Sequence, residues 1–460
     1  MHELLSVQHF SVNNGITLIL NVSCLITLDS DLEAIEDSTS WRRLAIQRDV
    51  DVVIEDGRIL RIGPHVAMEY EGRAELILSG SGLVVMPALV DAYASPSSLS
   101  KIGKEAVLRS QGVSAAELVA MNIMGAGARS KAAFASVADC EQSLMRFLSL
   151  AKNQGVALQE VKTGYCLSHA DSLQQWQMLC RNSERLQEIE IHPSFYGLNH
   201  PDTAKRGMSD FLEGLISELP QIASACRRQG PALAQSRKLS AGNARVPLGA
   251  VDVNIDAGSF TKDLADKWLA AAAQHGLDVL IHGDRSARAG GAELAVELAR
   301  RLDQKRERKR TGPRVLSVAH AKYSSESDLN RLAQLGVGVV ILPTQNEFRG
   351  LEQNDAARMR ASGVRVAIGS GYDPLESPFH NLWYSAYLAL TQCGFSLPEV
   401  IGGVTREAAF ALGYEDRYGT IQVGRPANLL AFAGDEPEDF MGSPLGENLI
   451  WTMRSALTPH

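Results

Sequence analysis

The sequence lacks the features that mark several common classes of protein. Its cysteines show no Cys-x-x-Cys spacing and are scattered along the chain at Cys24, Cys140, Cys166, Cys180, Cys226 and Cys393. This pattern indicates neither a zinc knuckle nor a disulfide framework, and it favours a reducing, cytoplasmic location. No apolar run is long enough for a transmembrane helix.

An excess of basic charge is also missing. The 45 Lys and Arg residues are outnumbered by 53 Asp and Glu residues, which gives a formal net charge of -8. Binding to phosphate groups requires a basic surface, so nucleic acid and anionic membranes are not expected as partners. We expect a small molecule instead.

The composition is that of a folded, water-soluble protein with a substantial core. Hydrophobic residues make up 45% and charged residues 21% of 460 residues. This length suits one large barrel with a smaller appendage, or two ordinary domains.

Both ends of the chain are rich in predicted strands. The run 15–28, "GITLILNVSCLITL", reads as a pair of strands, and Glu55-Asp56-Gly57-Arg58 reads as a tight hairpin. Short strands return at 419–424 and 427–434. We therefore expect both termini to form one small β-sandwich, with bounds 1–85 and 415–460.

Between these ends, short apolar strands alternate with amphipathic helices. Eight runs have this character: 83–93, 157–165, 188–198, 250–256, 277–284, 315–323, 336–344 and 364–372. They predict an α/β fold, a (β/α)8 barrel over residues 86–414, with a doubly wound sheet as the alternative. A Gly-, Ala- and Ser-rich stretch at 223–249 predicts a surface loop or lid.

Motifs in family order over residues 50 to 435 resemble the amidohydrolase superfamily, and within it the imidazolonepropionase group. They include "GLVVMPALVDAYAS", "EVKTGYCL", "IHGDRSARAGGAELA" and "VAIGSGYDPLESP". The resemblance implies a metallo-dependent hydrolase barrel with a small sandwich.

The same resemblance implies a metal site whose ligands are mostly replaced here. The family's first strand ends in a His-x-His pair and its eighth strand in an Asp that also serves as general base. Those positions hold Tyr93, Ser95 and Gly371, so of the four ligands only His282, on the fifth strand, is kept. Since a catalytic metal needs three or more convergent ligands, we expect no metal cofactor. The alternative is a relocated zinc or iron site formed by Asp373, His200, His282 and His320.

Polar residues at the predicted strand ends are the candidate site, because a barrel of this kind works at the C-terminal ends of its strands. The predicted catalytic residues are His282, His320 and Lys162. The predicted substrate-binding residues are Tyr93, Tyr165, Asn199, His200, Arg285 and Asp373. Arg285 and Lys162 together predict a cationic site for a carboxylate-bearing molecule.

Several roles stay open at this stage. Lys162 is either a buried lysine with a lowered pKa or a partner of Asp91. The phenol of Tyr93 either donates a proton or fills the volume of the missing metal. Asp284 either orients His282 or pairs with Arg285.

Two functions from different classes follow. The first is a divergent enzyme that acts on a small cyclic amide or related C–N compound without the standard metal site, by hydrolysis, cyclisation or isomerisation. The second is an inactive family member that binds a small ligand or a protein partner. The resemblance also suggests a homodimer.

Overall fold

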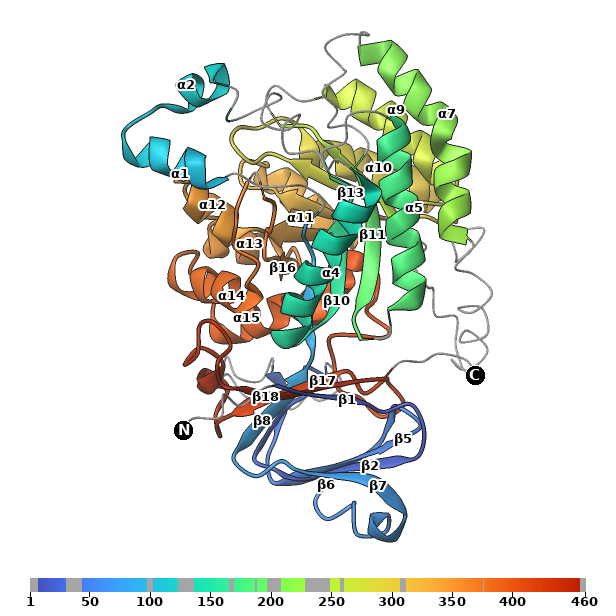
Figure 1. Ribbon diagram of the computed structural model, residues 1–460, viewed down its shortest axis with the longest axis vertical. Coiled ribbons are helices and arrows are strands. Elements are labelled where there is room, and N and C mark those ends of the chain that lie inside the picture. Colours follow the sequence, from blue (N-terminus) through green and yellow to red (C-terminus); the bar gives the residue numbers. More distant parts are fainter. Residues whose placement is uncertain are drawn as a thin grey trace.

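A barrel of parallel strands stands on a β-sandwich, and the barrel is uppermost in Figure 1. The computed structural model describes residues 7–29, 44–96, 102–121, 123, 136–164, 169–186, 188–196, 208–227, 249–256, 260–306, 312–374 and 376–455. Among the helices in those ranges, none combines the length and apolar composition that crossing a membrane requires.

Eight strands pair in chain order to make the barrel. They are β9 (Leu89–Asp91), β10 (Val156–Lys162), β11 (Glu190–Tyr196), β12 (Ala250–Asn254), β13 (Asp278–Gly283), β14 (Val315–His320), β15 (Gly338–Ile341) and β16 (Val366–Ile368). Every residue of β10, β13 and β14 is buried, as expected for parallel strands that are covered on both faces. The predicted (β/α)8 barrel is confirmed, and the doubly wound alternative is wrong.

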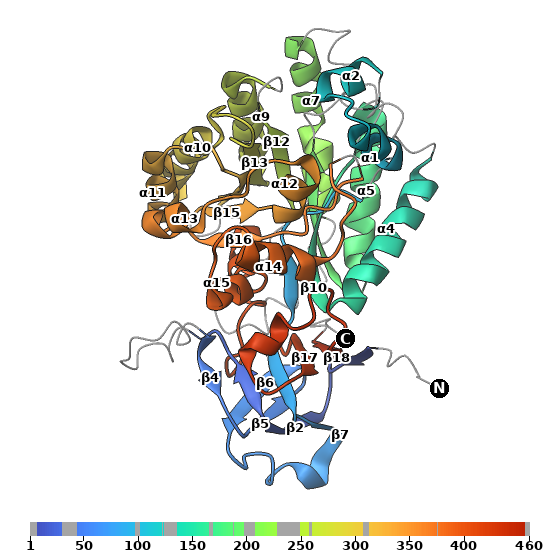
Figure 2. The ribbon, with the colours of Figure 1, turned by 90° about the vertical axis from the view of Figure 1, so that its left-hand side faces the viewer.

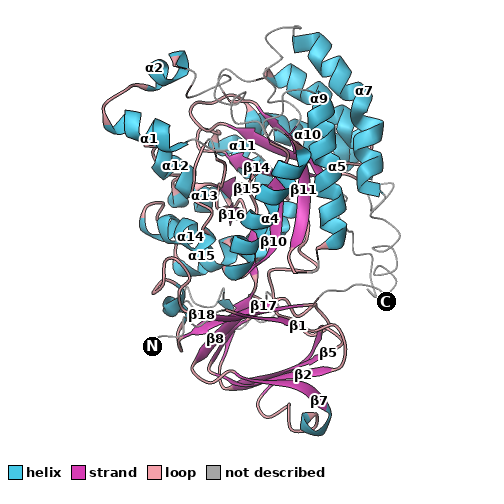
Figure 3. Cartoon of the chain, viewed as in Figure 1, coloured by secondary structure: helices cyan, strands magenta, loops and turns pink. Residues whose placement is uncertain are grey.

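Helices enclose the barrel on its outside, as the cyan ribbons around the magenta strands of Figure 3 show. They are α4 (Val137–Asn153), α5 (His169–Arg185), α7 (Met208–Arg227), α9 (Lys262–Gln274), α10 (Gly291–Arg306), α11 (Glu326–Gln334), α13 (Ala356–Ser362), α14 (Leu382–Thr391), α15 (Leu397–Gly403) and α16 (Arg406–Leu412). Three further helices belong to the loops after β9 and β15: α1 (Ile102–Ser110), α2 (Ala115–Ala120) and α12 (Pro343–Arg349).

Helix α9 illustrates why these segments are helical. Thr261 caps its N-terminus by accepting a hydrogen bond from the Leu264 amide, which satisfies a donor that the helix leaves unpaired. Its buried residues recur at helical spacing and form one apolar stripe: Ala265, Trp268, Leu269, Ala272 and Ala273. That stripe packs toward β12 and β13.

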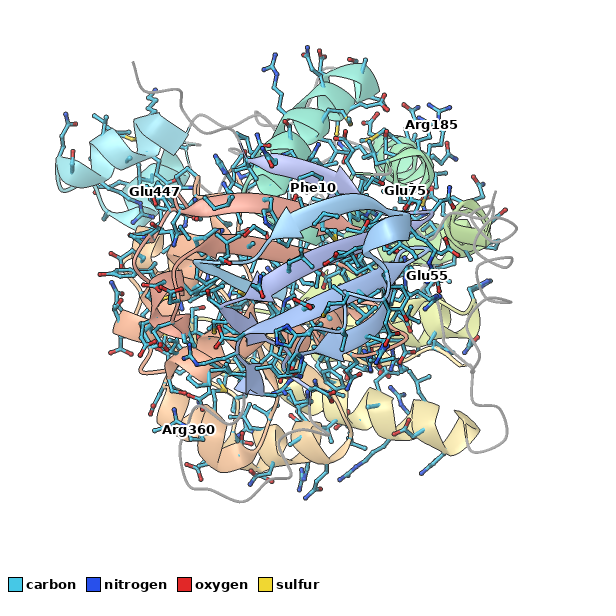
Figure 4. The ribbon with its side chains drawn as sticks, turned by 90° about the horizontal axis from the view of Figure 1, so that it is seen from below. Phe10, Glu55, Glu75, Arg185, Arg360 and Glu447 are labelled. Carbon is cyan, nitrogen blue, oxygen red and sulfur yellow. The ribbon has the colours of Figure 1, made fainter. Side chains whose placement is uncertain are left out.

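The sandwich joins strands from both ends of the chain, as predicted. Its six-stranded sheet contains β1 (Gln8–Ser11), β18 (Leu449–Arg454), β17 (Leu429–Ala433), β8 (Leu83–Pro87), β3 (Cys24–Ile26) and β4 (Ile46–Gln47). Its four-stranded sheet contains β6 (Arg58–Gly63), β5 (Val50–Glu55), β2 (Ile16–Val22) and β7 (Ala74–Ser79). Short 3-10 helices lie at Glu71–Arg73 and Pro437–Phe440. Figure 2 shows the sandwich below the barrel, and Figure 4 looks onto its outer sheet.

Three local predictions for the strands of the sandwich can be compared with the structure. The hairpin is confirmed, because Glu55 pairs with Arg58 and both Asp56 and Gly57 have positive φ angles. The run 15–28 forms two strands that belong to different sheets rather than a pair: they are separated at Ser23, close to Asn21, whose φ is 53°. The predicted strand at 419–424 is wrong, because this segment is irregular between two glycines of positive φ.

The predicted strand 83–93 divides where the chain passes from sandwich to barrel. The Ala88 amide donates to Asn428 in the sandwich, and the next amide, Leu89, donates to Gly155 beside the barrel. The domain bounds 1–85 with 415–460, and 86–414, stay a prediction. The loop predicted at 223–249 lies outside the described residues except at its ends, where residues 223–227 complete α7.

Asp91 closes the barrel between its first and last strands. One carboxylate oxygen accepts hydrogen bonds from the amides of Ser370 (2.9 Å) and Tyr93 (3.2 Å). Just beyond, Ala94 bridges to Tyr372, and the Ser95 amide donates to the Tyr372 carbonyl at 2.7 Å. These contacts fix the seam at which the candidate site begins.

Replacing Asp91 tests this closure. Asp91→Ala leaves two buried amide donors without their acceptor, so we expect a loss of about 2–4 kcal/mol in the free energy of unfolding. Asp91→Asn keeps an acceptor oxygen and should cost only about 1 kcal/mol. Urea denaturation of the three proteins measures both values, and equal losses for the two variants would contradict this role.

Candidate functional site

The predicted site residues that the structure describes lie at the C-terminal end of the barrel, which we call the barrel mouth. They are Tyr93, Lys162, His282, Arg285, His320 and Asp373, and only Arg285 is more than 5% exposed. Tyr165, Asn199 and His200, predicted to bind substrate, lie outside the described residues.

Lys162 sits in a buried ion-pair cluster. Its Nζ donates to Glu160 Oε1 at 2.7 Å and to Asp252 Oδ2 at 2.6 Å. The same Nζ lies 4.7 Å from the centre of the Tyr93 ring, in the geometry of a cation–π contact. Burial alone would lower the pKa of Lys162, but the two carboxylates outweigh it and raise the pKa. Both earlier interpretations are therefore wrong: the amine stays protonated, and it does not pair with Asp91.

The two carboxylates of this cluster differ in proton affinity. Burial alone would raise the pKa of Asp252, yet His282 and Lys162 hold it well below its usual value. Burial raises the pKa of Glu160 to about 7 in spite of Lys162. Asp252 is thus the fixed anion, whereas Glu160 exchanges its proton near neutral pH.

Protein groups occupy both ring nitrogens of His282. Nε2 lies 3.1 Å from Asp252 Oδ2, in contact with the carboxylate although outside the geometry of a good hydrogen bond. Nδ1 faces the Tyr93 hydroxyl at 3.5 Å, and the two rings are 4.9 Å apart. The ionised carboxylate favours the proton on Nε2, so Nδ1 accepts from the phenol. Burial raises the pKa of Tyr93 well above its usual value, so this phenol is a donor.

His320 stands next to His282 in a different environment. The two ring centres are 5.7 Å apart and the planes are perpendicular, at 88°. Asn354 Nδ2 donates to the backbone carbonyl of His320 at 2.9 Å, where the φ angle is 70°. Burial, reinforced by the charges of Arg285, His282 and Lys162, lowers the pKa of His320 well below its usual value. His320 therefore presents a neutral imidazole.

Asp284 has neither of its predicted roles. Its carboxylate accepts hydrogen bonds from four amides at the start of α10, of residues 289 to 292, and from the Ser324 hydroxyl. These contacts cap the helix.

The other two predicted residues at the mouth have distinct neighbours. Arg285 pairs with Glu376 at 2.8 Å, and the charge of Asp373 helps to raise the pKa of Tyr93.

Glu160 and Asp252 are the site residues that the sequence analysis missed. A signal was present, because each is a carboxylate inside a predicted barrel strand whose flanking residues are largely apolar. Glu160 and Lys162 are two positions apart on β10, so their side chains share one face of the strand. A charged pair on the inward face of a barrel strand requires partners, and Asp252 on β12 supplies one.

Three of the four positions that the resemblance assigns to metal ligands, Tyr93, His282 and Gly371, do not fit a divalent metal here. Tyr93 is a protonated phenol beside an ammonium group, and both nitrogens of His282 are occupied. No grouping of three or more His, Cys, Asp or Glu side chains suited to a metal exists among the residues that the structure describes. His200, a member of the predicted relocated site, is not among them.

Gly371 shows this misfit most clearly. Its φ angle is 66°, and a Cβ atom at this position would lie 2.9 Å from Gln345 Cγ and 3.3 Å from Thr344 Oγ1. Gln345 Nε2 also donates to the Gly371 carbonyl at 2.8 Å. Backbone strain and a filled neighbouring volume both oppose a side chain where the family has its aspartate.

We expect Gly371→Asp to lower the free energy of unfolding by about 2–4 kcal/mol, through left-handed backbone strain and overpacking. The double variant Gly371→Asp with Gln345→Ala should recover part of this loss, because the smaller side chain makes room. Chemical denaturation checks both, and wild-type stability for Gly371→Asp would show that Gln345 does not block the position.

The lowered pKa of His320 predicts a stability that falls in acid. Below about pH 6.5 this histidine takes up a proton in the unfolded chain but not in the folded one, so stability drops by up to about 1.4 kcal/mol per pH unit. We expect His320→Gln to remove this component from a pH series of urea denaturation curves. His65→Asn, at an exposed histidine with a positive φ that Asn accepts, is the matched control. An unchanged acid sensitivity in His320→Gln would refute the assignment.

Comparisons with known proteins agree with this architecture. The model of the amidohydrolase family matches residues 227–456. Over 422 residues the chain is 28% identical to an imidazolonepropionase of Bdellovibrio bacteriovorus, covering 91% of this chain and 90% of that one. An imidazolonepropionase of Bacillus velezensis is 28% identical over 420 residues, 90% of each chain.

Among solved structures, an adenosine deaminase from Xanthomonas campestris with bound zinc superposes with a TM-score of 0.63 at 13% identity, covering 98% of this chain and 93% of that one. An atrazine chlorohydrolase from Arthrobacter aurescens in complex with zinc gives a TM-score of 0.60 at 14% identity, with 96% of each chain covered. At these identities the structures establish the shared fold. With the barrel, the sandwich and the family model in agreement, the chain belongs to the amidohydrolase family.

Proposed function

We propose that this chain is a C–N hydrolase-type enzyme that acts on a small cyclic amide or related compound through imidazole acid–base chemistry, without the metal-bound hydroxide of its relatives. The observation that carries the proposal is the pair of perpendicular imidazoles, 5.7 Å apart at the barrel mouth. One is held between Asp252 and Tyr93, and the other is neutral.

The two histidines divide the proton transfers between them. His320, as the neutral imidazole, accepts a proton from water or from a substrate N–H group. His282 is oriented by Asp252 and its Nδ1 is hydrogen-bonded to the Tyr93 phenol, so it takes part in the proton transfer to the leaving nitrogen by way of this phenol. Lys162 keeps Asp252 ionised and is a positioning residue. Such a pair supports hydrolysis, ring closure or isomerisation.

The remaining assignments are part of the same proposal. Tyr93, Arg285 and Asp373 hold the substrate from the described part of the mouth, together with Tyr165, Asn199 and His200. The substrate is a small, carboxylate-bearing molecule, the protein is cytoplasmic, and it assembles as a homodimer. Relatives named imidazolonepropionase support the substrate class.

A second candidate function is ligand binding without turnover. Tyr93 favours it, because this side chain is only 5% exposed and fills the space between Lys162 and His282. A barrel mouth plugged in this way still offers Arg285 and Asp373 to a ligand.

Metal content and turnover together separate these functions. Protein purified without chelator is analysed for zinc and iron and assayed against hydantoins, imidazolones and cyclic imides, alone and with added metal. We expect turnover without stoichiometric metal, and a fall in kcat/KM of about 10²-fold or more in His320→Gln and in His282→Gln. His65→Asn is the control and should keep wild-type activity.

Stoichiometric metal with activity that chelation abolishes would contradict the metal-independent reaction. Absence of turnover on every compound, with a rise in melting temperature on ligand addition, would favour the binding function instead.

A further inference from the structure

Arg285 is a positive group at the described part of the barrel mouth that is partly open to solvent. Lys162, with which it was predicted to share this role, is 3% exposed and engaged by two carboxylates. Arg285 follows β13 in the chain, its amide donates to Asp256 Oδ1 at 2.8 Å, and its side chain is 16% exposed. Arg285 lies two residues after Gly283, which pairs with His320 across β13 and β14, so Arg285 follows the same strand end as the proposed base. Its charge also contributes to the lowered pKa of His320.

The guanidinium is only partly used within the protein. Its Nη1 donates to Glu376 Oε2 at 2.8 Å, whereas its Nε is buried and has no hydrogen-bond partner in the described structure. A carboxylate pairs best with arginine through two parallel hydrogen bonds. The contact with Glu376 is therefore a one-point contact, which a ligand carboxylate that makes two hydrogen bonds can replace.

Glu376 is the member of this group that is best placed to leave. It lies on a tight turn closed by hydrogen bonds from the amides of Glu376 and Ser377 to the Asp373 carbonyl, and its side chain is 29% exposed. Its Oε2 also lies 3.3 Å from Nε of Arg349. One partly exposed carboxylate is thus shared between two arginines.

The surrounding charges allow Glu376 to leave without stranding another buried charge. Arg349 on α12 also contacts Glu105 on α1, a carboxylate that is 3% exposed and that receives Arg109 at 2.9 Å. Figure 1 shows α1 and α12 on the same side of the barrel. If Glu376 turns to solvent, Arg349 keeps its ion pair with Glu105. Of the two arginines, Arg285 is then the one that requires a new anionic partner.

We propose that Arg285 binds the carboxylate of the ligand and that Glu376 occupies the same guanidinium until the ligand displaces it. The exchange selects anionic ligands, because a neutral molecule cannot replace the lost ion pair. It rests on the proposed function in that the bound molecule then lies over His320. The turn that carries Glu376 changes its contacts only when a ligand with a carboxylate is bound.

Calorimetric titration with hydantoin-5-propionate and its neutral amide tests this exchange. In Glu376→Gln the internal competitor loses its charge, so we expect the acid to bind about 10-fold more tightly and the amide to bind as in the wild type. In Arg285→Gln we expect the acid to bind at least 10-fold more weakly, again without an effect on the amide. Arg285→Lys, which keeps the charge but not the two-point geometry, should bind the acid more weakly than the wild type and more tightly than Arg285→Gln.

Asp266→Asn is the matched control, because it removes a carboxylate from the exposed pair with Arg301 on α9 and α10. It should bind both compounds as the wild type does. Thermal unfolding of each variant checks that it is folded. If Arg285→Gln does not fold, Arg285→Lys still tests the role of Arg285.

Three results would overturn the exchange: acid binding unchanged in both Arg285 variants, weaker acid binding in Glu376→Gln, or no measurable binding of the acid to wild type and Glu376→Gln alike. Tight, Arg285-dependent binding without turnover would instead refute the proposed enzymatic reaction and leave the exchange standing.

Discussion

The buried ammonium group of Lys162 is the charge on which the rest of the site depends. It lies within 2.7 Å of two carboxylate oxygens and 4.7 Å from an aromatic ring, in a part of the barrel that water does not reach. In such surroundings an unpaired charge costs several kcal/mol, so each member of the cluster restrains the others. Lys162 keeps Asp252 ionised, and Asp252 orients His282. His282 in turn accepts a hydrogen bond from the Tyr93 phenol.

The seam that closes the barrel and the candidate site are built from neighbouring residues. Asp91 receives amides from both sides of the seam, and Tyr93 follows it by two positions, so its ring points into the cluster. Gly371 lies on the other side, where Gln345 fills the volume beside it. The family resemblance assigns some of these positions to metal binding. In this chain the residues at those positions close the barrel and pack its interior. Under the proposed function, two imidazoles and a phenol are then the proton-transfer groups.

Positive charge at the mouth is divided between two groups with different duties. Lys162 is neutralised within the core and maintains the geometry of Asp252 and His282. Arg285 is neutralised by Glu376, a partly exposed carboxylate on a turn. Under the proposed exchange a ligand competes with the second arrangement and not with the first, because only the second is partly exposed to solvent. Recognition and catalysis can thus use separate charges in one small site.

The sequence alone determined the strand order, the barrel, the sandwich shared by both termini and the placement of His282 and His320 at the ends of adjacent strands, since these follow from hydrophobic periodicity and from parallel strands ending at one edge. The tertiary structure decided which charges meet. Lys162 pairs with Asp252, ninety residues away, rather than with Asp91; Asp284 caps a helix; and β2 and β3 enter different sheets. Periodicity specifies the face on which a side chain lies, but its partner depends on the register and spacing of strands that only the folded chain brings together.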